Sequence, residues 1–466
     1  MALSEAVLYL TVRELGDRIR TRQLSPVQLT EAYLERSKKY GPQLNAYVTL
    51  TPDLALQQAR KAEEEISQGH YRGPLHGIPY AAKDLLAVKG YPTTWGAKPY
   101  QSQRFDYDAT VIRKANEAGA VLLGKAAMIE LAGGLGYRFA AASATGAARN
   151  PWNTNCWTCG SSSGSGAIVA SAMAAFAIGT ETWGSIVCPS AFCGVSGLRP
   201  TFGRVGRGGA MALSYSMDKI GPMCRSADDC ALVLAAVSGH DPSDAGSLPQ
   251  SQARFTYSSP AKPLRMARIE KAWEKPDPDI ATAFEQALGV LQKAGATMSR
   301  VELPEGPYET AGGIVINVEA ASAYSTLIES GGVAQLSDPL SRVGGYVAQT
   351  TNSQDFIRAQ RIRRILQQKM DVVFQQHDVL VAPSLPIPAS TLGTNLETDL
   401  SFADPIGGIG NLCGLPALSV PCGFTKSGLP IGIQFLAQVL NDNAVIEAAG
   451  MFQARTEWHR EHPALK

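Results

Sequence analysis

The chain has 466 residues, 45% of them hydrophobic and 18% charged, and a formal net charge of +1 at pH 7. A chain longer than about 250–300 residues is expected to form two domains or one large domain built on a sheet. The balanced charge argues against nucleic acid or an anionic membrane as the main partner, because both select proteins with a concentrated basic face.

The N-terminal stretch and the longest apolar run both favour a protein outside the membrane. Met1–Leu10 contains Glu5 and lacks the basic stretch of a secretory signal. Ala167–Ile178 falls well short of the roughly 20 residues that cross a bilayer, and it suits a helix packed inside a protein. We therefore expect a soluble, cytoplasmic protein without a membrane segment.

Eight cysteines are too few for a disulfide framework in a chain of this length. Cys156 and Cys159 form a C-x-x-C pair, but a zinc site of this type needs a second such pair, and Cys188 and Cys193 are spaced differently. We therefore expect buried or half-buried free thiols and no bound metal.

The first 70 residues have helical patterning. Ser25 is placed as an N-cap with Pro26 at the first helical position, and this helix is expected to run to about Lys39 and stop at Gly41–Pro42. A second helix is expected over residues 53–67. We predict that residues 1–70 are a helical segment packed on the core and that residues 71–466 form an α/β domain.

From residue 73 onward, short apolar runs alternate with helical patterns. Helices are expected near 108–118, 226–238, 280–294 and 443–453, and strands near 120–123, 177–178, 195–198, 298–301, 379–382, 417–420 and 432–436. This alternation predicts a single large α/β domain with helices on both faces of a sheet. The polar stretch 240–265 is interpreted as a surface excursion within that domain.

Two turns rich in serine and glycine carry the most unusual composition. Residues 159–166 read Cys-Gly-Ser-Ser-Ser-Gly-Ser-Gly and lead directly into an apolar helix, whereas a Ser/Gly linker has polar flanks. A second turn, residues 179–186, follows that helix and a short strand, so the two turns are expected to face each other. Facing turns that present serines and backbone N–H groups are typical of acyl transfer.

A nucleophilic serine needs a base, and the six histidines are poorly distributed for that role. Lys83 lies in an otherwise apolar, strand-like stretch. Burial lowers the pKa of a lysine, which makes it a candidate general base near neutral pH. The alternative for Lys83 is an ordinary surface charge at a strand end.

Residues 160–164 also match G-x-S-x-G, the nucleophile elbow of α/β-hydrolases. That motif needs a hydrophobic strand directly before it, and residues 149–155 read as a loop. We therefore interpret this match as accidental.

Taken together, these segments resemble the amidase-signature hydrolases. The resemblance rests on a lysine segment and on four further blocks spread from the middle of the chain to its end: Gly77–Pro79 with Lys83–Asp84, Gly160–Thr201, Gly221–Met223, Asp378–Pro383 and Gly414–Pro421. It extends from about residue 10 to the C-terminus. It implies the amidase-signature fold, with a mixed, mostly parallel central sheet, and it implies neither metal nor organic cofactor.

The resemblance implies a Ser–cisSer–Lys triad. Carried over by position, Ser185 attacks the carbonyl, Ser161 follows a cis peptide and relays the proton, and neutral Lys83 accepts it.

The resemblance also implies an oxyanion hole and a substrate-binding position. Backbone N–H groups around Thr182, Trp183 and Gly184 would hold the oxyanion, and Ala132 and Gly133 match a position that lines the family's pocket.

Several residues near the nucleophile depart from the family pattern. Trp183 replaces a glycine, and its indole is expected near the acyl or leaving group, where it would favour flat or aromatic substrates. Glu181 replaces an aspartate. Val187 replaces an arginine, so a supporting ion pair is expected to be absent. Ala126–Ala127 replaces the usual Thr-Asn.

The function expected from these observations is a free-standing amidase that cleaves an amide-type C–N bond and has aryl-amide, carbamate (urethane) or ester activity. The expected partner is a small-molecule amide or carbamate, and a homodimer is compatible with the sequence. The alternative is the glutaminase subunit of a tRNA-dependent amidotransferase. A catalytically dead binding homologue is disfavoured because Lys83, Ser161 and Ser185 are all present.

Overall fold

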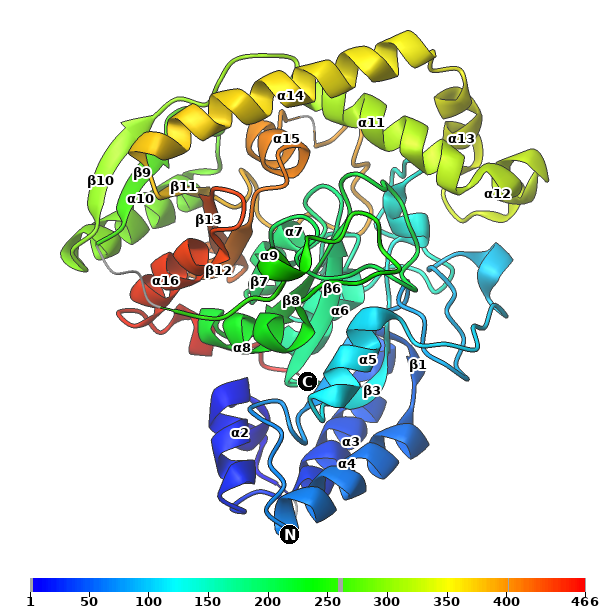
Figure 1. Ribbon diagram of the computed structural model, residues 1–466, viewed down its shortest axis with the longest axis vertical. Helices are drawn as coiled ribbons and strands as arrows, with labels where there is room; N and C mark the ends of the chain where they lie inside the picture. The colour runs from blue at the N-terminus through cyan, green and yellow to red at the C-terminus, as the bar shows by residue number, and fades with distance from the viewer. Residues whose placement is uncertain (1–2, 259–262, 401, 466) are drawn as a thin grey trace.

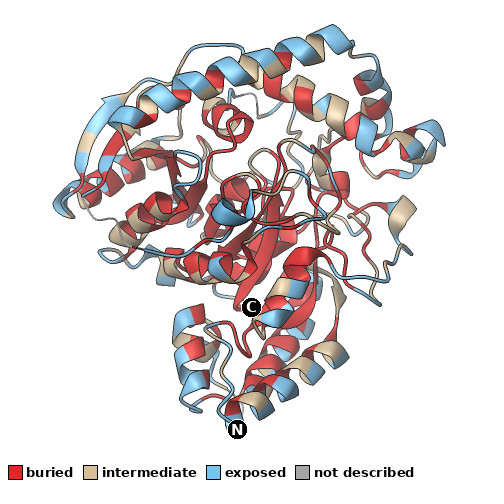
Figure 2. Ribbon diagram, in the orientation of Figure 1, coloured by how far each residue is buried: buried red, intermediate tan, exposed pale blue. Residues whose placement is uncertain are grey.

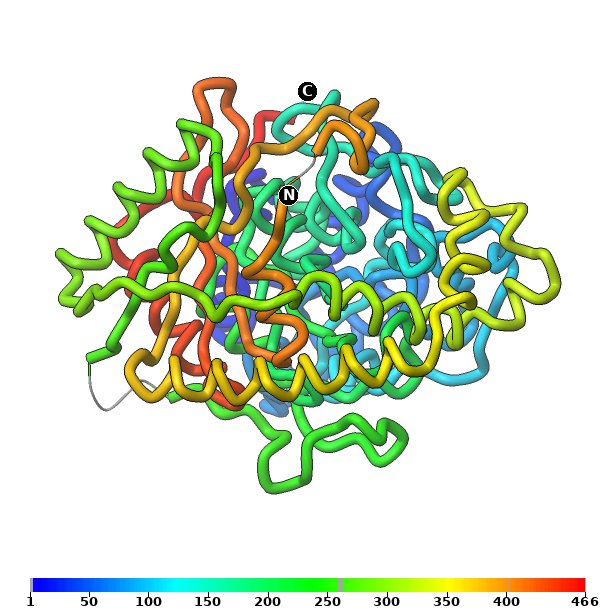
Figure 3. Tube along the Cα trace, turned by 90° about the horizontal axis from the view of Figure 1, so that it is seen from above, coloured from blue at the N-terminus to red at the C-terminus, as the bar shows by residue number. Residues whose placement is uncertain are grey.

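One large sheet crosses the molecule and carries helices on both faces (Figure 1). The computed structural model describes residues 3–258, 263–400 and 402–465. The N-terminal helices lie at one end of the molecule, and the long helix α14 crosses the opposite end (Figure 1). Seen from above, α14 runs beside α11 (Figure 3). In these three described ranges, no helix is long and apolar enough to cross a membrane.

The strands of the main sheet are β1 (Tyr47–Leu50), β2 (Pro79–Lys83), β3 (Val121–Ala126), β6 (Phe176–Glu181), β7 (Ser196–Arg199), β8 (Lys219–Cys224), β9 (Arg265–Ile269), β10 (Thr297–Val301), β11 (Val379–Pro383), β12 (Ala417–Phe424) and β13 (Pro430–Ala437). The helices are α1 (Glu5–Leu8), α2 (Val12–Arg20), α3 (Pro26–Leu44), α4 (Pro52–Ser67), α5 (Thr110–Glu117), α6 (Ser163–Ala170), α7 (Val187–Cys193), α8 (Ala227–Val237), α9 (Gln250–Ala253), α10 (Pro278–Lys293), α11 (Tyr308–Ala323), α12 (Ser325–Glu329), α13 (Ser341–Gln349), α14 (Ser353–Gln376), α15 (Pro405–Leu412) and α16 (Asp442–Gln453).

The strand order is β1-β3-β2-β6-β8-β7-β12-β13-β11-β9-β10. The sheet contains two blocks of three strands, β3-β2-β6 and β11-β9-β10, and neighbouring strands within each block pair in parallel. The strands between these blocks pair antiparallel, as does the edge strand β1. The single α/β domain with a mixed sheet is therefore confirmed, and the parallel pairing expected for it is confined to these two blocks.

Strand β11 shows how the sheet is covered on both faces. Val379 and Val381 belong to the core cluster that includes residues of α10 and α16, whereas Leu380 and Ala382 belong to a second cluster with α14 and α15. Successive side chains of a strand point to opposite faces of the sheet. Because helices cover both faces of β11, all four side chains are buried. Figure 2 shows this buried centre beneath α14, whose outer side is exposed.

The N-terminal segment contains the two expected helices, with one correction. The Ser25 side chain accepts a hydrogen bond from Gln28 N, as expected of the N-cap, but α3 continues through Pro42 and ends at Leu44. Its C-cap is Asn45, which has φ 49° and ψ 41°. Pro42 lies in the last turn of the helix, where Leu44 is fully buried. Strand β1, which was not expected from the sequence, pairs with β3 at the edge of the main sheet.

Residues 149–155 also differ from expectation, because they are not a plain loop. β4 (Arg149–Asn150) and β5 (Asn153–Trp157) form a separate two-stranded sheet. This small sheet lies before the first Ser/Gly turn, so no strand of the main sheet leads into residues 160–164. The structural context of a nucleophile elbow is therefore missing there.

Burial of β11 between two helical layers generates a stability prediction. Leu380→Ala removes a fully buried side chain and is expected to lower the free energy of unfolding by about 2–5 kcal/mol. The control is Val372→Ala on α14, whose side chain is 57% exposed and whose change is expected to stay within about 0.5 kcal/mol. Denaturant unfolding measures both, and equal losses would contradict the two-sided burial.

Candidate active site

Three side chains from distant parts of the chain form one hydrogen-bonded row. Lys83 Nζ donates to Ser161 Oγ at 2.8 Å, and Ser161 Oγ donates to Ser185 Oγ at 3.1 Å. Lys83 Nζ also donates to Thr180 Oγ1 at 2.9 Å. The peptide bond between Gly160 and Ser161 is cis, as the family resemblance implies. The structure thus brings the three residues singled out in the sequence within hydrogen-bonding distance.

Neighbouring elements explain how this row assembles. Lys83 ends β2, which pairs in parallel with β6, and β6 leads into the turn that carries Ser185. Ser161 lies just before α6. The turns themselves are joined, because Ser162 N donates to the backbone oxygen of Ser185 at 3.3 Å. Glycine is required at Gly160, where a Cβ atom would lie 2.6 Å from the side chain of Ile129.

Burial controls the charge of Lys83. Its side chain is fully buried and hydrogen-bonds only oxygen atoms of Ser161 and Thr180. Desolvation lowers the pKa of Lys83 to about 7, against the weaker opposing effect of Asp218 and Glu181. A lysine with this pKa is substantially neutral at physiological pH and is able to accept a proton.

The supporting ion pair that was expected to be absent is present. Glu181 Oε1 accepts a hydrogen bond from Arg199 Nη1 at 2.7 Å, and both side chains are buried. Glu181 Oε2 accepts the backbone N–H groups of Ile186 and Val187. Burial raises the pKa of Glu181, but Arg199 and the nearby Lys219 outweigh it and bring it to about 2. The arginine comes from β7, so its absence from position 187 does not remove the pair.

Asp218 and Lys219 hold the turn that contains Thr182 in place. Thr182 Oγ1 donates to Asp218 Oδ1 at 2.6 Å, and Lys219 Nζ donates to the backbone oxygen of Thr182 at 3.4 Å. In a planar trans peptide the C=O and N–H point in opposite directions. The N–H of Trp183 therefore points away from Lys219. Burial lowers the pKa of Lys219 and raises that of Asp218.

The indole of Trp183 is held by two helices. Trp183 Nε1 donates to Asp404 Oδ2 at 2.7 Å, and Asp404 Oδ1 caps α15 by accepting the N–H of Gly407. A Cβ atom added at Gly312 of α11 would lie 2.6 Å from the ring, and one at Gly407 would lie 2.6 Å from its nitrogen. We call the space beside Gly312, Gly407 and Gly408 the indole slot.

A cavity of about 300 Å³ lies beside Thr180 and Thr182. Of the two residues expected at a substrate pocket, Ala132 lines this cavity and Gly133 is not among its lining residues. Gly133 has φ +85°, and a Cβ atom there would lie 2.7 Å from the ring of Tyr137. The structure thus places Ala132 at the cavity and Gly133 against an aromatic side chain.

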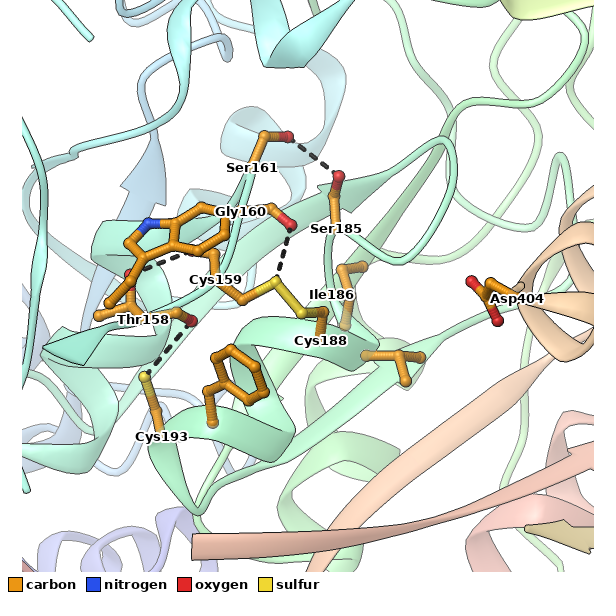
Figure 4. Close-up of a disulfide and its surroundings, with 12 residues drawn as sticks. Thr158, Cys159, Gly160, Ser161, Ser185, Ile186, Cys188, Cys193 and Asp404 are labelled. Atoms are coloured by element: carbon orange, nitrogen blue, oxygen red, sulfur yellow. Dashed lines mark hydrogen bonds between the residues drawn. A yellow bond between two sulfur atoms is a disulfide. The ribbon is translucent and has the colours of Figure 1, made fainter. Parts of the chain in front are cut away.

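The expectation that every cysteine is a free thiol is wrong for two of them. Cys159 and Cys188 form a disulfide with a Cα–Cα distance of 5.8 Å (Figure 4). The sequence did not predict this pair, because whether two cysteines can bond depends on their distance in the fold. Cys159 and Cys188 are 29 residues apart in the sequence, and nothing in the chain shows that they meet. Six cysteines are free and buried: Cys156, Cys193, Cys224, Cys230, Cys413 and Cys422.

Several residues that act behind the turns were not singled out in the sequence. Five such residues contact either the triad or the turn that carries Ser185: Thr180, Arg199, Asp218, Lys219 and Asp404. One signal was available for two of them, since Asp218 and Lys219 are charged residues in an apolar, strand-like segment. Nothing in the sequence alone links Asp404 to Trp183.

With this geometry in view, comparison with known proteins identifies the family. The amidase family profile, described as Amidase, matches residues 28–446. The chain belongs to the amidase-signature family and is a hydrolase of carbon–nitrogen bonds other than peptide bonds. The resemblance inferred from the sequence is therefore confirmed.

Several particular relatives cover almost the whole chain. The A subunit of the glutamyl-tRNA(Gln) amidotransferase of Geobacter metallireducens is 35% identical over 98% of this chain and 99% of its own. The native peptide amidase of Stenotrophomonas maltophilia is 32% identical, with a TM-score of 0.87 over 98% of each chain. A 6-aminohexanoate cyclic dimer hydrolase is 25% identical, with a TM-score of 0.86 over 98% of this chain and 99% of its own.

The indole slot generates a paired prediction on α11. Gly312→Ala is expected to displace the Trp183 ring, lower the melting temperature and reduce kcat several-fold, because overpacking costs about 1–3 kcal/mol. Gly313→Ala is the matched control, since its Cβ atom meets nothing within 4 Å. The gain in helix propensity, up to about 1 kcal/mol, applies to both variants. Thermal unfolding and steady-state kinetics test the pair, and equal behaviour would argue against the slot.

Proposed function

We propose that this protein is a free-standing amidase that works through a covalent acyl intermediate on Ser185. The observation that carries the proposal is the continuous hydrogen-bonded row from Lys83 through Ser161 to Ser185, with a lysine whose pKa burial lowers to about 7. A serine next to a proton-accepting relay is an activated nucleophile.

In the proposed reaction, Ser185 Oγ attacks the carbonyl carbon of the substrate. Its proton passes to Ser161 Oγ, whose own proton passes to neutral Lys83. Backbone N–H groups of the turn 182–185 stabilise the oxyanion of the tetrahedral intermediate. Collapse of the intermediate breaks the C–N bond, and the proton returns through Ser161 to the leaving nitrogen. Water then attacks the acyl group through the same relay and releases the acid.

The cavity beside Thr180 and Thr182 supports a neutral substrate. Its walls are mainly apolar and include Leu85, Met211 and Leu213. The charged residues at this cavity have partners within the protein. Arg207 donates to both carboxylate oxygens of Asp244, Asp218 accepts from Thr182, and Lys219 donates to the backbone oxygen of Thr182. An uncharged amide, carbamate or aryl ester finds hydrophobic contact here, and all three share the tetrahedral chemistry.

The second candidate function is the glutaminase subunit of a tRNA-dependent amidotransferase. Its support is the full-length similarity to proteins named as the A subunit of glutamyl-tRNA(Gln) amidotransferase. Glutamine carries two opposite charges that need polar recognition. The charged residues that line the cavity are Arg207, Asp218, Lys219 and Asp244. All four already have partners inside the protein, so we favour the free-standing enzyme.

A substrate screen with a matched pair of serine variants tests the proposal. Anilides, primary amides, carbamates and esters are offered to the wild type, to Ser185→Ala and to Ser163→Ala. Ser185→Ala is expected to lose at least about a thousandfold in kcat, whereas Ser163→Ala, in the neighbouring turn, retains activity. Intact-mass analysis of a slow ester should show an acyl adduct on the wild type and none on Ser185→Ala. Full activity in Ser185→Ala would overturn the mechanism.

The charge of Lys83 sets the expected pH dependence. Protonated Lys83 cannot accept a proton, so kcat/KM is expected to fall about tenfold per pH unit below pH 7 and to level off above it, with the neutral substrate as reporter. Lys83→Ala should lose this dependence along with most of the activity. A wild-type profile that stays flat as the pH falls below 7 would contradict the role of Lys83.

Glutamine distinguishes the two candidate functions. The purified chain alone is expected to hydrolyse anilides or carbamates with a higher kcat/KM than glutamine and to purify without a second protein. A preference for glutamine, or stable co-purification of a partner that raises glutaminase activity, would instead support the amidotransferase role.

A further inference from the structure

The Cys159–Cys188 disulfide joins the two segments that carry the reactive serines. Cys159 lies two residues before Ser161, and Cys188 lies three residues after Ser185, in the first turn of α7 (Figure 4). The bond therefore joins the two segments close to the 3.1 Å contact between the two serine hydroxyls.

The other described links between the two segments are hydrogen bonds. At the serines they are the hydroxyl contact itself and the bond from Ser162 N to the backbone oxygen of Ser185 at 3.3 Å. Farther from the reacting hydroxyls, the Ser162 side chain bonds the backbone of Thr180, and Cys193 Sγ donates to the backbone oxygen of Thr158 at 3.9 Å. The disulfide is the only covalent link among these described contacts. On the α7 side, Cys188 N donates to the backbone oxygen of Gly184 at 2.8 Å. Cys188 is thus attached both to the nucleophile turn and, through sulfur, to the segment of Ser161.

The backbone at Cys159 gives the cross-link a second role. Cys159 has φ +64°, in the left-handed region that residues with a side chain adopt only when their surroundings hold them there. Its covalent attachment to α7 is one such restraint. If the bond is broken, Cys159 is free to relax, and Gly160 and Ser161 follow it directly in the chain.

We propose that the Cys159–Cys188 disulfide positions Ser161 against Ser185, so that the hydrolase activity depends on the thiol–disulfide state of this pair. The inference rests on the proposed function, since it concerns the same serines. The two cysteines are positioning residues, because neither touches the reacting atoms in the proposed mechanism.

The chemistry of the change is reversible. A dithiol such as dithiothreitol supplies two electrons and two protons, the Sγ–Sγ bond becomes two thiols, and the reagent closes into its own cyclic disulfide. Cys159 and Cys188 are 8% and 9% exposed, whereas Cys193 in the same helix is fully buried. Where disulfides occur in reducing compartments, they are usually transient and catalytic or redox-sensing, which fits a pair located at the site.

Thiol counting in denaturant tests whether the bond exists. The untreated protein is expected to show six reactive thiols, and the reduced protein eight. Eight thiols in protein purified without reductant and exposed to glutathione disulfide would overturn the proposal.

Kinetics of the two forms test whether the bond matters. Reduction is expected to lower kcat on an anilide about tenfold, with KM changed less than about twofold, since a misplacement of 1 Å at a reacting group costs up to about a hundredfold. Reoxidation with glutathione disulfide should restore kcat. The labelling rate of Ser185 with a fluorophosphonate probe should fall in parallel with kcat on reduction. Unchanged kcat and labelling after complete reduction would overturn the proposal.

Two variants serve as controls. The double variant Cys159→Ser/Cys188→Ser is expected to have the low kcat of the reduced protein and no response to dithiothreitol. Cys156→Ser, three residues before Cys159 in the sequence, keeps the disulfide and should respond as the wild type does. A response of the double variant to dithiothreitol would place the effect elsewhere. If neither redox form hydrolyses substrate or reacts with the probe, the proposed function itself fails.

Discussion

The site depends on an amine held out of water without a carboxylate partner. Lys125, on the neighbouring strand β3, is equally buried, and its Nζ lies 2.9 Å from Asp84 Oδ1. Lys83 has only hydroxyl and carbonyl oxygens at hydrogen-bonding distance, and the charges of Asp218 and Glu181 act on it from farther away. Removing a charge from water is costly, so the neutral amine is stabilised. The difference between the two lysines lies in their immediate neighbours.

Keeping carboxylates away from Lys83 requires that nearby charges be satisfied by other groups. Glu181 is neutralised by Arg199, and its remaining oxygen accepts two backbone N–H groups of the nucleophile turn. Asp218 accepts hydrogen bonds from Thr182 and from the backbone of residues 213 and 214. The charges around the site thus serve to fix the turn. Among the described contacts of the Lys83 amine, Ser161 is the hydroxyl that connects it to Ser185, whereas the Thr180 hydroxyl is its other hydroxyl partner.

Local patterns in the sequence predicted much of this structure. Strongly periodic helices such as α4 and α10, and apolar runs such as those of β11 and β12, were predicted close to their observed positions because one or both faces are buried. The helices α11 to α14 were not predicted. In α14 only Ala359, Leu366, Met370 and Phe374 are buried, so its apolar signal is spread thinly among charged residues.

The site residues likewise divide into those that the sequence predicted and those that it did not. The two Ser/Gly turns and Lys83 are visible in the chain because their composition is unusual for their surroundings. Arg199 and the Cys159–Cys188 pair are not, because their partners are chosen by the sheet order and by the approach of α7 to the first turn. Contacts between separate elements depend on the assembled fold, and a single sequence carries no local signature of them.

The indole slot limits the order in which substitutions around Trp183 could arise during evolution. Gly407 is restricted in any case, because a Cβ atom there would lie 2.0 Å from Asp404 Oδ2 as well as close to the indole. Gly312 differs, since the atoms that a Cβ would meet there all belong to the ring of Trp183. A lineage with glycine at position 183 would have tolerated a larger residue at position 312, but the reverse order of substitution would have met a steric clash. Trp183 and Gly312 are therefore expected to be inherited together, and these two positions should covary among relatives even though they lie far apart in the sequence.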